Sequence, residues 1–517
     1  MTSKRSAIAL VIFATFIGLA VRLGPSLTAA FPLNDGGLFY AMMRDLRANG
    51  YALPAFAHYN GVDIPFVYPP LGFYASSLLA DLFRADLLDV MRWLPPLVSA
   101  LTIPAFYLLA RGFSPSRTTA ALAALIFALT PRAFAWQIMG GGVTRSFGFL
   151  FAILTLACAH RLFTAPTRRI LVWTSICAAL TVLTHPEDAA QVAFAALLLY
   201  LFFDRSRAGL VRALIVAGLT LILTAPWWGL VIARHGINPF LAASSAVRSN
   251  NVSLMIRPFM LFQFEFTEEP FLQVIAILGL IGLFLRLDKR DGFLPAWLAL
   301  AFLFEPRSAP LTMTIPLSLL ATTALADLIL PQLTRTSDND SLEGLLNGRN
   351  ARAFFGFLFV TMVIGAYFTS NRIAQEYTLT SVDLQAMQWA QANTAEDSAF
   401  AIVTGESPLF DAVSEWFPAL TGRVSAATVF GYEWIHDGRF ATRMSGYNAL
   451  QDCMVQKSDC IQEWSNDYGI AFTYIMIRNF RNGKFLISPL QVYLDRSGEF
   501  TLVYHTQEIS IYSKNKP

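Results

Sequence analysis

The sequence is poor in charged residues. They make up only 14% of its 517 residues, whereas soluble globular proteins carry about 25%. Hydrophobic residues account for 55% of the chain, and several apolar runs approach the roughly 20 residues that a helix needs to cross a bilayer. This composition excludes an ordinary soluble protein and predicts a polytopic membrane protein. The net charge of +3 is small, so it gives no basis for binding nucleic acid.

Ionisable side chains are also scarce at the centres of the apolar runs. Arg22, Arg132 and Asp327 lie near the ends of theirs. Ion-coupled transporters usually keep such groups near the middle of the membrane, so their scarcity argues against transport of that kind. The first apolar run lacks an Ala-x-Ala-like cleavage site, and we therefore expect an uncleaved first span rather than a signal peptide.

The apolar runs predict an α-helical membrane domain over residues 1–370, with about 11 spans. We expect these spans near 6–23, 90–110, 118–138, 146–163, 170–184, 189–203, 210–230, 270–285, 292–304, 309–330 and 353–370. With the N-terminus inside, most Lys and Arg residues of the connecting segments fall on the inner side, as the positive-inside rule requires. The expected location is a cell (plasma or inner) membrane, with a cytoplasmic N-terminus and a flexible cytoplasmic loop at 331–352.

The composition becomes more polar after the last predicted span. An odd number of spans places residues 371–517 on the outer side, where we expect a mixed α/β domain. Its predicted elements are a helix at 382–391 and strands at 399–403, 472–477, 500–504 and 509–512. Cys453 and Cys460 are the only cysteines of this domain. They could form a disulfide in an oxidising compartment, although two free thiols are equally compatible with the sequence.

Residues 24–89 form a large outer loop with two helices predicted to lie on the membrane surface. The first, 38–46, carries apolar residues at spacings of three and four. The second covers 69–84 and has a proline in its first turn. Asp35 stands at the start of the first helix, in an otherwise apolar entry. An acid at this place is either the N-cap of the helix or a reactive group.

Three short motifs follow one another in this region. Asn34-Asp35-Gly36 opens the first surface helix, Tyr68-Pro69-Pro70-Leu71 opens the second, and Arg92-Trp93-Leu94-Pro95 begins a span. Their order and topology resemble the GT-C superfamily of membrane glycosyltransferases. This superfamily includes protein O-mannosyltransferases, aminoarabinose transferases and the catalytic subunit of oligosaccharyltransferase.

The resemblance implies an enzyme that takes a sugar from a polyprenyl-phosphate-linked donor at the outer face of the membrane. The acceptor would be a lipid, a glycan or a protein. Asp35 matches the catalytic acid that the superfamily carries in its first outer loop. The resemblance therefore implies that Asp35 acts as a general base on an acceptor hydroxyl or orients the acceptor, while the helix-cap interpretation stays open.

One departure from the superfamily concerns the next outer loop. The oligosaccharyltransferase branch has an Asp-x-Asp-like pair there that helps to hold a divalent metal. The corresponding stretch, Met139 to Arg145, contains no acid, so we predict no metal ligand and leave a divalent cofactor open. Arg145 could face a phosphate or serve as an interfacial anchor. Two further functions remain: an oligosaccharyltransferase-like enzyme with an altered metal site, and a non-catalytic membrane protein that binds lipid-linked glycans.

Other polar side chains of the outer segments are candidates for substrate binding. Together with Arg145 they are Tyr68, His185, Glu187, Asp188, Glu268 and Arg307. The His185–Asp188 segment could bind an acceptor or form a solvated turn. Glu268 could be a helix cap, and Arg307 could bind a lipid phosphate or pair with a neighbouring acid. Two aromatic stretches, 415–418 and 432–434, could stack on an acceptor sugar or form a domain core.

Overall fold

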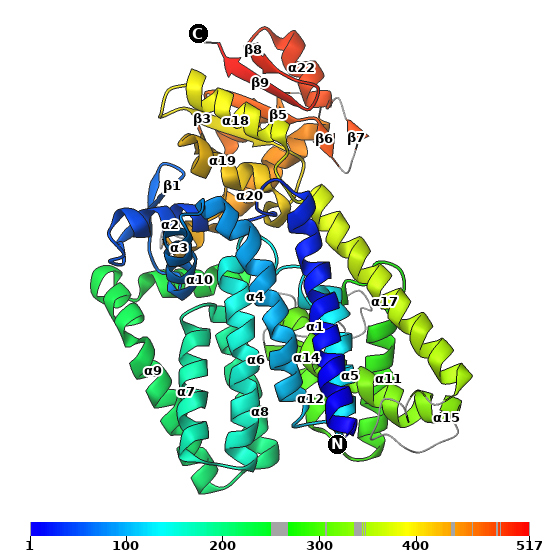
Figure 1. Ribbon diagram of the computed structural model, residues 1–517. Helices are drawn as coiled ribbons and strands as arrows, with labels where there is room; N and C mark the ends of the chain where they lie inside the picture. Colours follow the sequence, from blue (N-terminus) through cyan, green and yellow to red (C-terminus); the bar gives the residue numbers. More distant parts are fainter. Residues whose placement is uncertain are drawn as a thin grey trace.

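The computed structural model describes residues 2–249, 267–304, 308–334, 344, 346, 348–435, 440–456, 459–481, 484–485 and 488–515. A helical bundle forms the larger part of the molecule, and a smaller mixed domain lies on one end of the bundle (Figure 1). The N-terminus lies at the opposite end of the bundle from this domain. The predicted division into a helical bundle and a C-terminal α/β domain is therefore observed.

Every predicted span overlaps a helix. The bundle helices are α1 Thr2–Thr28, α4 Leu87–Ala110, α5 Arg117–Leu129, α6 Gly142–Thr164, α7 Arg168–Val182, α8 Pro186–Phe203, α9 Arg207–His235, α11 Val274–Asp288, α12 Phe293–Phe304, α13 Ala309–Thr312, α14 Thr314–Ala324, α15 Leu330–Thr334 and α17 Arg349–Glu376. Within the described residues, 7 helical segments are long and apolar enough to cross a membrane by themselves. The number of spans stays a prediction, because α5, α7, α11 and α12 are shorter.

One predicted span was wrong in its second half. We expected helix over 118–138, but α5 ends at Leu129, and Thr130 takes an extended backbone conformation. The reason is Pro131, because a proline disfavours helical geometry in the residue before it. A 3-10 turn, η1 Pro131–Ala133, follows. The chain then continues through buried residues, Trp136 being half-buried, to the start of α6.

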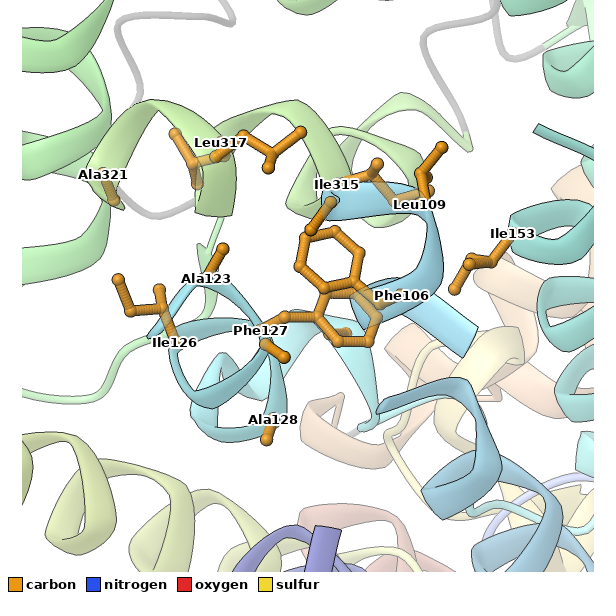
Figure 2. Close-up of a cluster of buried hydrophobic side chains, with 14 of the residues drawn as sticks. Phe106, Leu109, Ala123, Ile126, Phe127, Ala128, Ile153, Ile315, Leu317 and Ala321 are labelled. Carbon is orange, nitrogen blue, oxygen red and sulfur yellow. The ribbon is translucent and has the colours of Figure 1, made fainter. Parts of the chain in front are cut away.

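Four bundle helices meet in a core of interlocking apolar side chains (Figure 2). Phe106 of α4 stacks on Phe127 of α5, with ring centroids 4.4 Å apart. Ile153 of α6 and Leu317 of α14 belong to the same buried cluster. Small residues such as Ala123 line α5, where they allow neighbouring helices to approach closely. This core fixes α4, α5 and α6, whose outer ends carry the loops discussed below.

The outer loop contains both predicted helices, observed as α2 Gly37–Ala48 and α3 Leu71–Phe83. The apolar face of α2, which we expected to meet the membrane, is buried in protein. Its side chains Leu38, Met42, Met43 and Leu46 are fully buried. The C-terminal domain contributes Trp416 to the cluster that holds them, so protein contacts remove this face from water.

Sequence reasoning missed a hairpin between these helices. Strands β1 Phe56–Tyr59 and β2 Val62–Pro65 pair antiparallel. The dipeptide between them, Asn60-Gly61, has φ of +56° and +71°, and Asn-Gly is the preferred pair for such two-residue turns. The Asn60 side chain donates to Ser425 O (3.1 Å) and accepts from Ser425 N (2.7 Å). The hairpin is thereby fastened to the C-terminal domain.

The C-terminal domain contains a five-stranded mixed sheet in the order β4-β3-β5-β9-β8. The central strand β5 runs parallel to β3 and antiparallel to β9. The domain's elements are α18 Ser381–Asn393, β3 Ala399–Val403, α19 Ala412–Thr421, β4 Val424–Ser425, α20 Phe440–Asp452, α21 Cys460–Tyr468, β5 Tyr474–Arg478, β6 Phe480–Arg481, β7 Lys484–Phe485, α22 Pro489–Ser497, β8 Phe500–His505 and β9 Ile509–Lys514. All four predicted strands and the predicted helix are present. Cys453 and Cys460 form a disulfide.

The orientation in the membrane stays a prediction from the distribution of positive charge. It can be tested with single cysteines at two exposed positions, Gln507 in the C-terminal domain and Asp288 at the other end of the bundle. An impermeant thiol reagent should label Gln507→Cys in intact cells, whereas Asp288→Cys should require permeabilised cells. The parent chain measures the background from Cys158 and Cys177. The opposite labelling pattern would reverse the topology.

Candidate functional site

The predicted catalytic loop lies where the bundle, the outer loop and the C-terminal domain meet. Leu33 forms a β-bridge with Thr378, and its carbonyl accepts from Gly140 N (2.7 Å). Asn34 has φ of +52°, a conformation that asparagine tolerates better than most residues. Its side chain donates to Leu409 O (2.9 Å). These bonds hold the backbone on both sides of Asp35.

The carboxylate of Asp35 forms a two-pronged ion pair with Arg145. The Nη1–Oδ2 and Nη2–Oδ1 distances are 2.6 and 2.8 Å. Gly141 N also donates to Oδ1 (3.1 Å). The interpretation of Asp35 as a helix cap is wrong. The N-cap of α2 is Gly36, which has no side chain that could accept a hydrogen bond from the helix. The Asp35 side chain faces the start of α6 instead.

Glycines permit this close approach. A Cβ atom on Gly140 would clash with the carbonyl oxygen of Asp35, and one on Gly141 would lie 2.7 Å from Asp35 Oδ2. Carbon and oxygen atoms that are not bonded to each other cannot approach so closely. The run Gly140-Gly141-Gly142 is therefore required by sterics at the point where two loops cross.

Arg145 is fixed by more than its acid partner. Its Nε donates to Trp136 O (3.0 Å), and its guanidinium carbon lies 5.6 Å from the centre of the Trp136 ring. The side chains of Asp35 and Arg145 remain 15% and 17% exposed. The pair is thus held in one geometry while staying accessible, and Arg145 is not a simple interfacial anchor.

Tyr68 joins the same region. Its hydroxyl lies 3.4 Å from Thr144 Oγ1, one residue before Arg145. Burial raises the pKa of Tyr68, against a smaller opposing effect of Thr144 and of the charge on Arg145. The phenol therefore stays protonated and can donate a hydrogen bond. The following helix is anchored by Leu71 N, which donates to Leu183 O at the end of α7 (2.9 Å).

The His185–Asp188 segment lies at the start of α8 and packs against α6, the helix that carries Arg145. His185 is the N-cap of α8, and its ring nitrogen accepts from Asp188 N (3.3 Å). Asp188 is only 1% exposed, so the expectation of a solvated turn does not hold for it. Gly148 of α6 packs against both side chains, since a Cβ there would lie 2.6 Å from Asp188 Oδ2. This contact lies three residues after Arg145 on α6, which places the segment close to the pair.

One predicted residue is not brought to this place. Glu268 forms an ion pair with Arg132 instead. Its neighbour Glu269 accepts from Ile275 N (3.1 Å), at the start of α11, which supports a capping role for this acidic stretch. Arg307 lies outside the described residues, and its binding to a lipid phosphate stays a prediction.

Sequence reasoning missed Glu415, which α19 places beside Asp35. It is 3% exposed, and its Oε1 accepts from Gly36 N (3.0 Å). Burial, and then the negative charge of Asp35, raise the pKa of Glu415 well above its usual range. A single acid between Val413 and Trp416, within an apolar helical pattern, was the available signal. The Trp416 beside it is fully buried, as expected for a domain core.

The geometry of the pair does not suit a divalent metal. Both oxygens of Asp35 are engaged by the guanidinium and by Gly141 N, and a cation at the same carboxylate would meet the positive charge of Arg145. Within the described ranges, no three His, Cys, Asp or Glu side chains converge as a metal site would require. The residues present therefore fit a guanidinium in place of a metal.

Comparison with known proteins identifies a matching family and similar solved structures. The family described as dolichyl-phosphate-mannose-protein mannosyltransferase matches residues 67–229, less than half of the chain. No curated protein sequence matches the chain. Among solved structures, the archaeal oligosaccharyltransferase AglB from Archaeoglobus fulgidus superposes with a TM-score of 0.58 at 14% identity, over 99% of this chain and 74% of that one.

Two further solved structures are similar. The arabinofuranosyltransferase AftD from Mycobacteria superposes with a TM-score of 0.57 at 14% identity, over 98% of this chain and 40% of that one. ArnT from Cupriavidus metallidurans gives 0.55 at 14% identity, over 97% of both chains. This chain has the GT-C fold. The resemblance predicted from three short motifs is confirmed, and the similar structures are glycosyltransferases, the enzyme class that the sequence predicts.

The raised pKa of Glu415 predicts how stability depends on pH. An unfolded glutamate has a pKa of about 4.3, so the raised value in the folded state stabilises the protein at low pH and that contribution is lost as the pH rises. Glu415→Gln cannot ionise. Its melting temperature in detergent should therefore rise relative to the parent as the pH increases from about 4 to about 7.

The charge of Asp35 contributes to this effect, and that supplies a control. In an Asp35→Asn background the pH-dependent gain from Glu415→Gln should shrink. A difference between variant and parent that stays constant with pH would show that Glu415 has no raised pKa in the folded protein.

Proposed function

We propose that this protein is a membrane glycosyltransferase that moves a sugar from a polyprenyl-phosphate donor to an acceptor at the outer face. The observation that carries the proposal is the ion pair between Asp35 and Arg145. It combines a carboxylate that can accept a proton with a cation that can hold a phosphate, in a chain that has the GT-C fold.

The comparisons support a lipid-phosphate donor. The matched family is described by a dolichyl-phosphate-linked sugar, the ArnT structure holds undecaprenyl phosphate, and the AglB structure holds a dolichol-phosphate with an inhibitory peptide. The names of the similar proteins differ in the sugar, since the matched family is described as a mannosyltransferase and AftD as an arabinofuranosyltransferase. The identity of the sugar and of the acceptor therefore does not follow from the likeness.

In the proposed reaction, an acceptor hydroxyl attacks the anomeric carbon of the donor sugar. A new carbon–oxygen bond forms, the bond from that carbon to the phosphate oxygen breaks, and the lipid phosphate leaves with the electron pair. Asp35 takes the proton of the acceptor hydroxyl. Arg145 binds the phosphate and stabilises the charge that grows on it as it leaves.

The pairing of Asp35 gives this scheme an order of events. Both of its carboxylate oxygens are engaged by Arg145. A donor phosphate competes with the carboxylate for the guanidinium, because both are acceptors for the same planar fork. Binding of the donor thus frees an Asp35 oxygen for the acceptor, so that the base becomes available once the donor is in place.

Polar groups around the pair can hold the sugar and the acceptor. Tyr68 offers a hydroxyl donor beside Arg145. Asp188 and His185 pair with each other, the ring nitrogen Nδ1 lying 3.1 Å from Oδ2, and Glu187 adjoins them in the same segment. Tyr68, His185, Glu187 and Asp188 are therefore proposed as substrate-binding residues.

An oligosaccharyltransferase-like enzyme is the second candidate, favoured by the match to AglB over nearly the whole chain. Against it, the segment that would supply a second acidic motif contributes Arg145 instead. Turnover separates both enzymes from a protein that only binds lipid-linked glycans, because only an enzyme releases the lipid phosphate from a polyprenyl-phosphate sugar.

Asp35→Asn tests the base. The amide accepts hydrogen bonds but takes up no proton, so release of lipid phosphate should slow at least about a hundredfold. Asp63→Asn is the matched control, because Asp63 lies in the same outer loop with its side chain 65% exposed, and this variant should retain the parental rate. A parental rate in Asp35→Asn would remove Asp35 from the chemistry.

Arg145 can be tested separately through donor binding. Arg145→Lys keeps the charge but loses the planar fork, and we expect about tenfold weaker binding of polyprenyl phosphate, with a larger loss in Arg145→Ala. Binding can be measured by competition with a labelled lipid-linked sugar. Unchanged affinity in both variants would mean that the guanidinium serves only to orient Asp35.

A further inference from the structure

The C-terminal domain reaches into the loop that carries Asp35. Gly36 N donates to Glu415 Oε1 (3.0 Å), and Trp416 Nε1 donates to Asn34 O (2.8 Å). The Tyr59 hydroxyl also donates to the backbone oxygen of Glu415 (2.6 Å). Residues on both sides of Asp35 are thus bonded to two successive residues of α19.

The contact leaves no free space. A Cβ on Gly37 would lie 2.6 Å from Glu415 O, and one on Gly36, whose φ is +134°, would lie 3.0 Å from the Trp416 ring. Two glycines at the start of α2 therefore allow α19 to touch the helix end directly.

The start of a helix has unpaired N–H groups and a partial positive charge, which favour an acid. Asp35 is the acid nearest to the start of α2 in the sequence, yet its carboxylate lies on Arg145. Glu415 takes the position at the helix end that Asp35 would otherwise be free to occupy. Asp35 thus pairs with Arg145, and Glu415 accepts a hydrogen bond from the start of α2. A single side chain could not make both contacts.

We infer that Glu415 is a positioning residue for Asp35. By capping α2 from the C-terminal domain, it keeps the Asp35 carboxylate directed at Arg145 and at the substrates. The Glu415 carboxylate is engaged by Gly36 N, so it acts on Asp35 through the loop. This inference rests on the proposed function, and it makes the C-terminal domain part of the active site rather than an acceptor-binding accessory.

Two variants at Glu415 test the inference. Glu415→Gln keeps an oxygen that can accept from Gly36 N, whereas Glu415→Ala removes the cap. We expect Glu415→Ala to lower kcat by about tenfold to a hundredfold through misplacement of Asp35, with little change in KM for the donor. Glu415→Gln should retain most of the parental kcat.

A control for general destabilisation lies in the same domain. Asp383 is also a fully buried acid at a helix start, where it accepts from Thr380 N (2.7 Å). Asp383→Ala should lower the melting temperature as Glu415→Ala does, but leave kcat unchanged. An equal loss of kcat in Asp383→Ala would overturn the inference, because domain stability would then explain both.

A double variant and a readout without turnover complete the test. In the Asp35→Asn background, Glu415→Ala should cause no further loss of rate, since it acts through the same carboxylate. Hydrogen exchange of the amides near residues 36–38 should be faster in Glu415→Ala and near parental in Glu415→Gln. Additive losses of rate, or unchanged exchange in Glu415→Ala, would each overturn the inference.

The exchange measurement separates the two proposals. If the parent released no phosphate from any polyprenyl-phosphate sugar, the proposed function would fail. The capping role of Glu415 would then be decided by exchange alone.

Discussion

The ion pair between Asp35 and Arg145 is the constraint on which the outer half of this molecule depends. A carboxylate and a guanidinium that lie partly out of water need close and complete pairing, since an unpaired charge there is costly. Here the pair joins two segments 110 residues apart in sequence. It requires a left-handed residue before the acid and glycines opposite it. The local irregularities of the site follow from this single contact.

The pair also explains why the two parts of the chain cannot be understood separately. The bundle supplies Arg145, the outer loop supplies Asp35, and the C-terminal domain supplies the group that occupies the start of α2. The hairpin is fastened to the same domain through Asn60 and Ser425. The apolar face of α2, which would otherwise meet lipid, is the surface on which these parts assemble.

Much of the architecture could be predicted because it follows from short-range pattern. Apolar runs located the bundle helices, strand-forming residues located the four strands, and three motifs identified the fold. The failures have two causes, tertiary contact and local signals that were not weighed. The amphipathic pattern of α2 showed a buried face but not what buries it, and Pro131 outweighed an apolar run that suggested a longer helix. Asn60-Gly61 was a readable hairpin signal that was overlooked.

The site was predictable to a similar degree. Asp35, Tyr68, Arg145 and the His185–Asp188 segment do gather in one region. Their pairing was not foreseeable, because the sequence shows that a loop contains an arginine but not which acid it meets. Glu415 was missed since it lies in another domain, within a stretch whose aromatic residues drew attention instead.

The early end of α5 has a consequence for how this protein can vary. Its 13 residues rise about 20 Å, and the irregular segment that follows is largely buried in protein. Buried backbone must find its hydrogen bonds inside the protein, and Gly140 and Gly141 find theirs in Leu33 and Asp35. Surface loops tolerate insertions, but an added residue here would leave amides unpaired and move the guanidinium past its partner. Natural variants of this enzyme should therefore differ in loop length elsewhere, and keep this turn constant.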